Sequence, residues 1–206
     1  MRSPGGHPLF ARFYDSWLAG VIERGKLGAL RHDLVAQADG VVLDLGSGTG
    51  QNLPHLGSSV TRVHLVEPDP HMVRRLRPRV PRNGVVHQAP GEDLPLDDAG
   101  VDTVLATLTL CTVDDLPRAL AEIRRVLRPG GRMLVLEHVL SQDPRLAGWQ
   151  ARLRTPWRWA GGGCNLDRET ATTLADNGFD TSALRRFRIA GTWPAEEWVS
   201  GVVTRW

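Results

Sequence analysis

The stretch Asp-Leu-Gly-Ser-Gly-Thr-Gly at residues 44–50 constrains the fold of this chain more than any other part of its sequence. It directly follows residues 41–43, Val-Val-Leu, and together 41–45 have the apolar character of a buried strand. Glycines after a strand let the backbone approach a ligand closely, because no side chain intervenes. They also direct the N-terminus of the following helix toward that ligand. The stretch therefore predicts a strand–turn–helix unit with a ligand at the turn.

The spacing of the glycines narrows the kind of ligand. Dinucleotide-binding turns follow the pattern Gly-x-Gly-x-x-Gly, whose third glycine allows the helix to pack tightly. Here the pattern is Gly46-x-Gly48-x-Gly50 and residue 51 is glutamine, which disfavours NAD and flavin. Asp44 would repel a pyrophosphate, whereas it suits the ammonium group of an amino-acid-bearing cofactor such as S-adenosylmethionine. The alternative is an ordinary turn with a buried capping aspartate.

The rest of the chain alternates apolar runs with helical patterns. This rhythm predicts right-handed crossovers and a parallel sheet. We expect strands at 41–45, 60–66, 84–88, 101–107 and 133–136, with helices at 70–76 and 115–127. A helix at 168–177 and strands at 182–189 and 197–204 complete the chain. The predicted fold is α/β and Rossmann-like: a mostly parallel seven-stranded sheet with an antiparallel edge hairpin and helices on both faces.

The length of 206 residues predicts a single domain over 1–206. We divide it into an N-terminal helical lid, a cofactor-binding core, a substrate-cap insertion, and a C-terminal helix with the edge hairpin. These parts correspond to residues 1–38, 40–139, 140–166 and 167–206.

Composition excludes several classes of protein. A net charge of +2 gives no strong attraction to nucleic acid or to an anionic membrane. No apolar run is long enough for a transmembrane segment. The two cysteines cannot form a secreted disulfide framework and lack metal-ligand spacing, so we expect a cytoplasmic protein without a metal. We expect a monomer or a homodimer.

Two acidic positions fit the remainder of the cofactor. Glu67, which is followed by Pro68, comes at the end of the second predicted strand. A carboxylate there can accept hydrogen bonds from both hydroxyls of a ribose. The alternative for Glu67 is a helix cap. After the third strand, Gly91 lets the backbone lie against an adenine, and Glu92 or Asp93 accepts from its amine. For Asp93 the alternative is a solvated turn.

These elements, with the Pro-Gly-Gly at 129–131, resemble the class I S-adenosylmethionine-dependent methyltransferases over residues 40–138. Within that class, a second set of motifs is similar to the methyltransferase-like family that includes animal alkyl thiol S-methyltransferases. These motifs include Glu137-His138-Val139, Gly163-Cys164 and Arg168-Glu169-Thr170. The resemblance implies S-adenosylmethionine as cofactor, S-adenosylhomocysteine as product and a small molecule as methyl acceptor.

The resemblance also implies further site residues. Thr107 and Leu108 follow the fourth strand at the cofactor pocket, and Tyr14 belongs to an N-terminal element that folds over the cofactor. Tyr14 alternatively forms a core stripe with its aromatic neighbours. We add Ser47 and Asn52 to the cofactor-binding set.

In open parallel sheets, ligands bind at the carboxyl ends of the strands. His138 lies there and is our candidate general base, or the group that orients the acceptor; the alternative is a structural histidine. Glu137 either orients the imidazole or stays buried. Trp157 and Trp159 are expected to wall the acceptor pocket, unless they pack the insertion onto the sheet. Cys111 and Cys164 border the opening or simply fill space.

A thiol is the most specific acceptor that the resemblance implies. Amine, hydroxyl or carbon acceptors of a specialised metabolite or quinone stay open, as does a protein that binds the cofactor without methyl transfer. Nucleic acid is not expected as a substrate, because residues 106–109 read Ala-Thr-Leu-Thr where exocyclic-amine methyltransferases carry Asn/Asp-Pro-Pro-aromatic.

Overall fold

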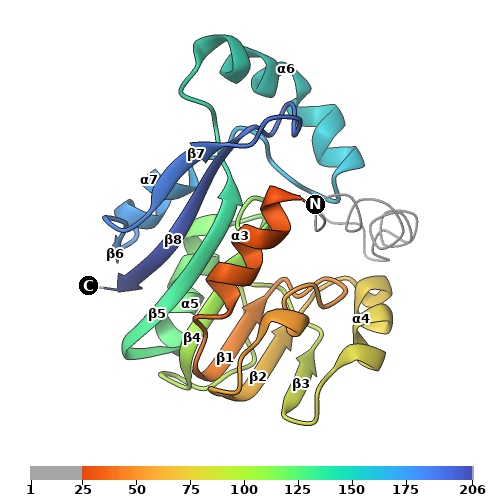
Figure 1. Ribbon diagram of the computed structural model, residues 1–206, viewed down its shortest axis with the longest axis vertical. Coiled ribbons are helices and arrows are strands. Elements are labelled where there is room, and N and C mark those ends of the chain that lie inside the picture. The colour runs from red at the N-terminus through yellow and green to blue at the C-terminus, as the bar shows by residue number, and fades with distance from the viewer. Residues whose placement is uncertain (1–24, 206) are drawn as a thin grey trace.

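The computed structural model describes residues 25–205. Their centre is one twisted sheet in the order β3-β2-β1-β4-β5-β8-β6, with β7 also paired to β8 (Figure 1). The strands are β1 (Gly40–Leu45), β2 (Val60–Val66), β3 (Gly84–His87), β4 (Val101–Thr107), β5 (Leu127–His138), β6 (Phe179–Asp180), β7 (Arg185–Arg188) and β8 (Glu197–Arg205).

Strands β1 to β5 are parallel, and β8 lies antiparallel to β5. This arrangement confirms the predicted Rossmann-like class. The sheet has eight strands where seven were expected, because its edge is divided into β6 and β7, which pair with opposite ends of β8. Residues 181–184 turn away between them. A Cβ on Gly201 would lie 2.4 Å from the carbonyl oxygen of Ala183, so glycine at 201 is what allows this close approach.

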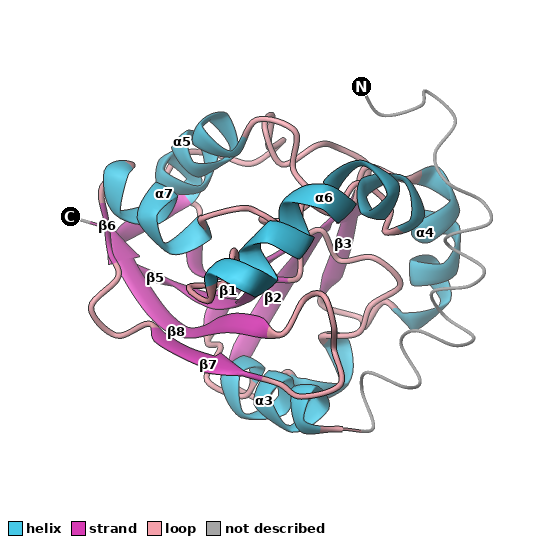
Figure 2. Cartoon of the chain, turned by 90° about the horizontal axis from the view of Figure 1, so that it is seen from above, coloured by secondary structure: helices cyan, strands magenta, loops and turns pink. Residues whose placement is uncertain are grey.

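Five α-helices accompany the sheet among the described residues. They are α3 (Lys26–Val35), α4 (Pro70–Leu76), α5 (Leu116–Val126), α6 (Pro144–Ala160) and α7 (Thr170–Asp176). Helix α3 covers one face of the sheet, and α5 and α7 cover the other (Figure 2). None of the helices within 25–205 combines the length and apolar content that crossing a bilayer requires.

Side chains of the central strands point alternately to the two faces of the sheet, so each face has its own apolar core. Leu43 and Leu45 belong to the cluster that includes α5, whereas Val42 packs with Leu34 and Val35 of α3. Because both faces are covered, the strands read as nearly continuous apolar runs. Helix α3 is thus part of the core, and this corrects the expectation that residues up to 38 form a lid. Residues 1–24 lie outside the described residues.

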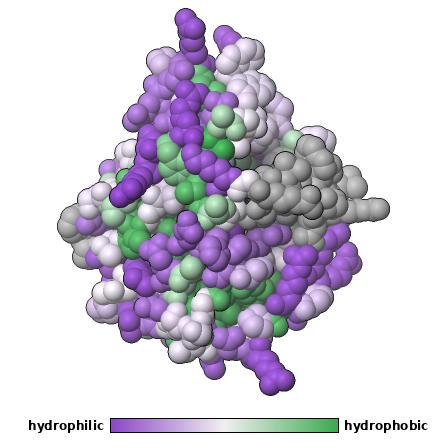
Figure 3. Space-filling view, viewed as in Figure 1, coloured by the Kyte–Doolittle hydropathy of each residue, from purple (hydrophilic) through white to green (hydrophobic). Residues whose placement is uncertain are grey.

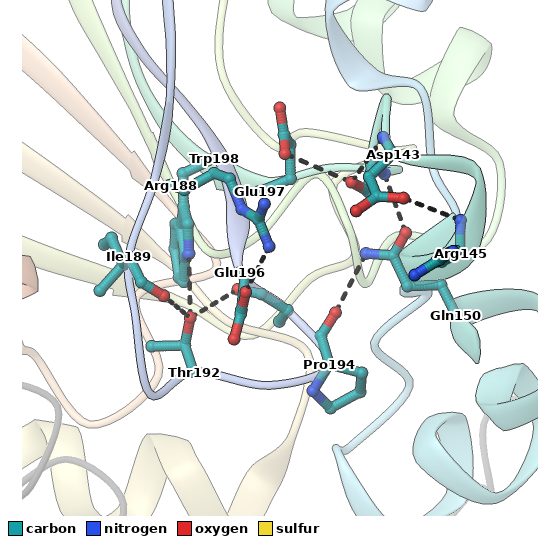
Figure 4. Close-up of polar contacts among 12 residues, drawn as sticks. Asp143, Arg145, Gln150, Arg188, Ile189, Thr192, Pro194, Glu196, Glu197 and Trp198 are labelled. Carbon is teal, nitrogen blue, oxygen red and sulfur yellow. Dashed lines mark hydrogen bonds and ion pairs between the residues drawn. The ribbon is translucent and has the colours of Figure 1, made fainter. Parts of the chain in front are cut away.

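The predicted substrate-cap insertion is mainly the helix α6, which the sequence did not predict. Asp143 caps its start by accepting from the Arg145 amide at 2.9 Å. The buried Gln150 fixes it: Nε2 donates to the carbonyl of Pro194 at 3.1 Å, and Oε1 accepts from the Ser141 amide at 2.8 Å (Figure 4). The helix lies at the top of the molecule, where the visible surface is largely hydrophilic (Figures 1 and 3).

Candidate functional site

A pocket lies at the carboxyl ends of β1 and β4. It is lined by Arg31, Gly46, Ser47, Gly48, Gln51, Asn52, Thr107 and Leu108. Six of these residues were predicted to bind the cofactor, and the structure brings them together at one edge of the sheet. Ligands of open parallel sheets bind at this edge.

Backbone geometry explains why the loop contains glycine. Gly46 has φ +63°, and a Cβ there would lie 2.5 Å from Cγ2 of Thr109. Gly48 has φ +55° and its amide donates to Oε2 of Glu67 at 2.9 Å. Opposite the loop, Leu108 adopts φ +58°, a conformation that non-glycine residues seldom adopt and that is often found at functional sites. At Gly46 and Gly48, which have no side chain, the loop therefore presents backbone to the pocket.

Asp44 is the acidic group below this pocket. It is 1% exposed, and its Oδ1 accepts from Nδ2 of Asn52 at 2.6 Å. Its Oδ2 is buried and has no hydrogen-bond partner within residues 25–205. Burial raises the pKa of Asp44 to about 6, although Asn52 and the charge of Arg31 oppose that shift. A buried acceptor of this kind fits a cationic ligand group, because such a group supplies the missing donor.

Arg31 is a site residue that the sequence reasoning missed. It is 2% exposed, and its Nη1 donates to Oδ1 of Asn52 and to Oγ1 of Thr107, both at 2.8 Å. It places a positive charge in the pocket lining. Leu27, Arg31 and Leu34 share the buried face of α3, so a charged residue at a core position of the helical pattern was the available signal.

The other predicted cofactor residues lie around the pocket. Glu67 follows β2 and, besides Gly48, accepts from the Asp69 amide at 2.8 Å. Asp69, rather than Glu67, caps α4. Pro68 directly follows Glu67, whereas Gly91 lies in the turn after β3 and is buried against Leu45.

Glu92 and Asp93 differ in their surroundings. Oε1 of Glu92 accepts from the backbone amides of Asp114 and Asp115 at 2.8 and 3.1 Å. Asp93 is exposed to solvent. The structure thus gives Glu92 a role in holding the loop that precedes α5.

Three chemically reactive side chains meet beside the pocket. Cys111 comes from the loop after β4, His138 ends β5 and Cys164 follows α6. Nε2 of His138 lies 2.8 Å from Sγ of Cys164, and Nε1 of Trp157 donates to the same sulfur at 3.3 Å. In the parallel pair of β4 and β5, Leu136 lies beside Thr107. His138 is two residues beyond Leu136 on β5, which places it about 7 Å farther along the strand direction.

The surroundings of these groups shift their ionisation. A hydrogen bond from Cys111 lowers the pKa of Cys164 well below its usual value, and His138 lowers it further, against the effect of burial. The same hydrogen bond, with burial, raises the pKa of Cys111. Burial acts to lower the pKa of His138, but Cys164 and Glu137 raise it overall. The cluster therefore favours a thiolate at Cys164.

Glu137 is completely buried beneath this cluster. Its Oε1 accepts from the amides of Thr109 and Leu110 at 2.6 and 2.7 Å, and its Oε2 accepts from the Cys111 amide at 3.3 Å. Burial raises the pKa of the carboxyl. Of the two roles expected for Glu137, the structure shows the buried one: its carboxylate holds the loop that carries Cys111.

The two tryptophans expected to wall the pocket point in different directions. Trp157 is half-buried on Cys164, whereas Trp159 is 85% exposed. Side chains two positions apart in a helix point to different faces. Because the sequence did not predict a helix in this segment, it did not predict this difference. Trp159 is therefore not a wall of a pocket formed by residues 25–205. Tyr14 lies outside the described residues.

Comparison with known proteins agrees with this geometry. A model of the family described as "Methyltransferase domain" matches residues 43–135. Human thiol S-methyltransferase TMT1B is 34% identical over 176 residues, covering 78% of this chain and 72% of that protein. Human thiol S-methyltransferase TMT1A is 32% identical over 159 residues, covering 74% and 65%.

A solved structure of an S-adenosylmethionine-dependent methyltransferase from Thermotoga maritima superposes with a TM-score of 0.67 at 23% identity. The match covers 96% of this chain and 97% of that one. At this identity the likeness supports the fold.

Proposed function

This chain belongs to the class I S-adenosylmethionine-dependent methyltransferases, in the family that includes the thiol S-methyltransferases, and we propose that it methylates the sulfur of a small-molecule thiol. The observation that carries the proposal is the Cys111–His138–Cys164 cluster at the carboxyl end of β5, beside the pocket that fits the cofactor. Similarity to two thiol S-methyltransferases supports the choice of acceptor.

The residues of the pocket fit the amino-acid end of the cofactor. Oδ2 of Asp44, which has no hydrogen-bond partner within residues 25–205, suits its ammonium group, and the Arg31 guanidinium, next to Asn52 and Thr107, suits its carboxylate. Glu67 at the end of β2 is proposed for the ribose, because a carboxylate there can accept hydrogen bonds from both ribose hydroxyls. S-adenosylmethionine supplies a methyl group on a sulfonium sulfur.

The remaining residues act on the acceptor. Methyl transfer is an in-line displacement, so the protein must align the nucleophile and exclude water. His138 and the two cysteines are positioned to control the acceptor's proton and orientation. A thiol has a pKa of about 8.5 and is already partly ionised near neutral pH, which suits a buried site without a carboxylate base facing the acceptor.

One assay tests the acceptor class. The protein is incubated with methyl-labelled S-adenosylmethionine and a panel of thiols, amines, phenols and quinols, and reactions without protein correct for spontaneous methylation. We expect label on thiols only. Label confined to a phenol, an amine or a quinol would contradict S-methylation, and label on no compound would favour a cofactor-binding protein without methyl transfer.

The raised pKa of Asp44 predicts pH-dependent cofactor binding. Without ligand the carboxyl becomes protonated as the pH falls through about 6, whereas the ammonium group requires the ionised form. Below pH 7 an α-ammonium group of ordinary pKa, about 7.7–8.0, stays charged. We expect the dissociation constant to be flat near pH 7 and to rise by up to about tenfold per unit below pH 6.

Isothermal titration calorimetry between pH 5 and pH 7 measures this dependence. Uptake of the ligand at pH 5 should release a proton, which buffers of different ionisation enthalpy reveal. The Asp44→Asn variant is the control, because its weaker binding should not vary with pH. A wild-type affinity that stays constant down to pH 5 would contradict an ion pair at Asp44.

A further inference from the structure

The Cys111–His138–Cys164 cluster has the composition of a metal site. Its three potential ligand atoms, Sγ, Nε2 and Sγ, all lie within 4.8 Å of one another. They come from three separate segments: the loop after β4, the end of β5 and the loop after α6. Because these segments are distant in sequence, the usual ligand spacing is absent, and the sequence predicted no metal.

Neighbouring residues hold the three segments in place. Asn165 ties the two loops together: its amide and its Nδ2 both donate to the carbonyl of Cys111, at 2.9 and 2.8 Å. Arg168 donates to the carbonyls of Leu110 and Val113 at 2.5 and 2.8 Å. Glu137 binds the Cys111 amide from the other side. These hydrogen bonds therefore hold the backbone of the cluster in place, and none of them uses the sulfur or nitrogen atoms that would bind the metal.

From this arrangement we propose that Cys111, His138 and Cys164 bind a zinc ion. Two thiolates and an imidazole are ligands that zinc prefers, at about 2.3 Å for sulfur and 2.0–2.1 Å for nitrogen. In a tetrahedral site these bonds separate sulfur from nitrogen by about 3.5 Å. The present 2.8 Å between His138 and Cys164 would thus lengthen by roughly 0.7 Å. His138 ends its strand and Cys164 lies in a loop, so both can move by that amount.

Only three ligands come from the described residues, which leaves the fourth position of a tetrahedral zinc for the acceptor. Sites with three protein ligands and one exchangeable position are typical of catalytic zinc. Cys164, in the loop after α6, is the least buried of the three residues. This role rests on the proposed thiol S-methylation, and it replaces direct proton acceptance by His138 with metal activation.

The proposed reaction moves the methyl group from the sulfonium sulfur to the sulfur of the acceptor. The acceptor thiol binds the metal and loses its proton to water, because a coordinated thiol is deprotonated. Its sulfur forms a bond to the methyl carbon while the bond from that carbon to the sulfonium breaks. The electron pair of the broken bond stays on the departing S-adenosylhomocysteine. The thioether product carries no charge and binds zinc weakly, which allows the site to turn over.

Metal content tests the site without reference to activity. The full chain is purified without chelators and analysed by inductively coupled plasma mass spectrometry, and we expect about one zinc per chain. Cys164→Ser, which alters a partly exposed loop residue, should weaken zinc binding at least about 100-fold. The matched control is His87→Ala, which removes a histidine that lies 3.0 Å from His64 and outside the cluster, and should leave the zinc in place.

Cobalt substitution gives a second readout. Co²⁺ added to the metal-free protein should produce a thiolate-to-metal charge-transfer band, which Cys111→Ser and Cys164→Ser each remove while circular dichroism reports an intact fold. Absence of zinc together with no cobalt band would overturn the proposal, as would loss of zinc in His87→Ala. A Cys111–Cys164 disulfide in the freshly purified protein would also overturn it.

The acceptor assay separates this proposal from the proposed function. Thiol methylation that persists undiminished in chelator-treated, metal-free protein would overturn the activation of the acceptor by zinc while sustaining S-methylation. Zinc bound by these three residues in a protein that methylates only other acceptors would sustain the site and contradict the thiol. If both proposals hold, metal removal should lower thiol methylation at least about 100-fold, and added zinc should restore it.

Discussion

Replacing Asp44 with asparagine is expected to weaken S-adenosylmethionine binding by about two to four orders of magnitude while making the protein more stable. The binding loss follows from the burial of the carboxylate, whose Oδ2 has no partner within residues 25–205. An ammonium group placed there without its counter-charge loses about 3–5 kcal/mol, the usual cost of breaking a buried ion pair. Calorimetric titration at pH 7 measures the change in affinity.

The gain in stability follows from the pKa of the same group. Because the folded pKa of Asp44 is raised from 3.8 to about 6, the associated stabilisation is present below pH 3.8 and is lost as the pH rises through 6. At pH 7 the buried charge therefore lowers the free energy of unfolding by about 3 kcal/mol. Asparagine removes this charge, and the melting temperature without ligand should rise by about 5–10 °C.

The control for this variant is Asp39→Asn. Asp39 precedes the same strand at its opposite end, where it is exposed and pairs with Arg132 at 3.2 Å. It should leave cofactor affinity unchanged. Cofactor binding by Asp44→Asn as tight as that of the wild type would contradict the assignment of the pocket.

Replacing His138 with alanine is expected to lower the rate of methyl transfer by about 10²–10⁴-fold, because the change removes a ligand of the zinc ion that we propose to activate the acceptor. Cofactor affinity should change by less than about threefold, since His138 is not among the residues lining the cofactor pocket. The imidazole contacts Cys164 and packs against Trp198, so some loss of stability accompanies the change. Single-turnover rates on folded protein separate these effects.

His138→Gln and His87→Ala serve as comparisons. Glutamine preserves much of the volume beside Trp198, so a variant that recovers the melting temperature but not the rate would identify a chemical role. His87 ends β3 and therefore also lies at the carboxyl ends of the parallel strands. Its removal should leave the rate intact. A His138→Ala enzyme within a few-fold of the wild-type rate would show that the histidine is structural.

The fold was predictable where a pattern is local. Helix α5 was expected at 115–127 and spans Leu116–Val126, since its apolar side chains recur at helical spacing and Asp115 caps it. Strand β5 was expected at 133–136 but extends over Leu127–His138, because Leu127 already pairs with Val101 and the residues up to Arg132 form an irregularity in the register. Helix α6 was missed, since Gly148 and Pro156 interrupt its pattern and only Leu146 and Gln150 are buried.

The residues of the candidate site could likewise be predicted only where the sequence pattern is local. Asp44 and the glycines were predicted because they lie at the end of a strand and in the turn that follows it, whereas Thr107 was predicted from the family resemblance. Arg31 and the opposed directions of Trp157 and Trp159 depend on helices whose orientation no motif encodes. For Glu137 the sequence left two roles open, and the structure shows the buried one, with three backbone amides bound to its carboxylate.

The sequence by itself determined the cofactor half of this protein. A glycine turn after a strand and an acidic residue beside it are local features, and their spacing alone distinguishes an amino-acid-bearing cofactor from a dinucleotide. Only the tertiary structure brought together the three residues that we propose for the acceptor. Cys111, His138 and Cys164 belong to segments that are distant in the chain, and their side chains meet only because the sheet places β4 beside β5 and α6 returns its following loop to that edge.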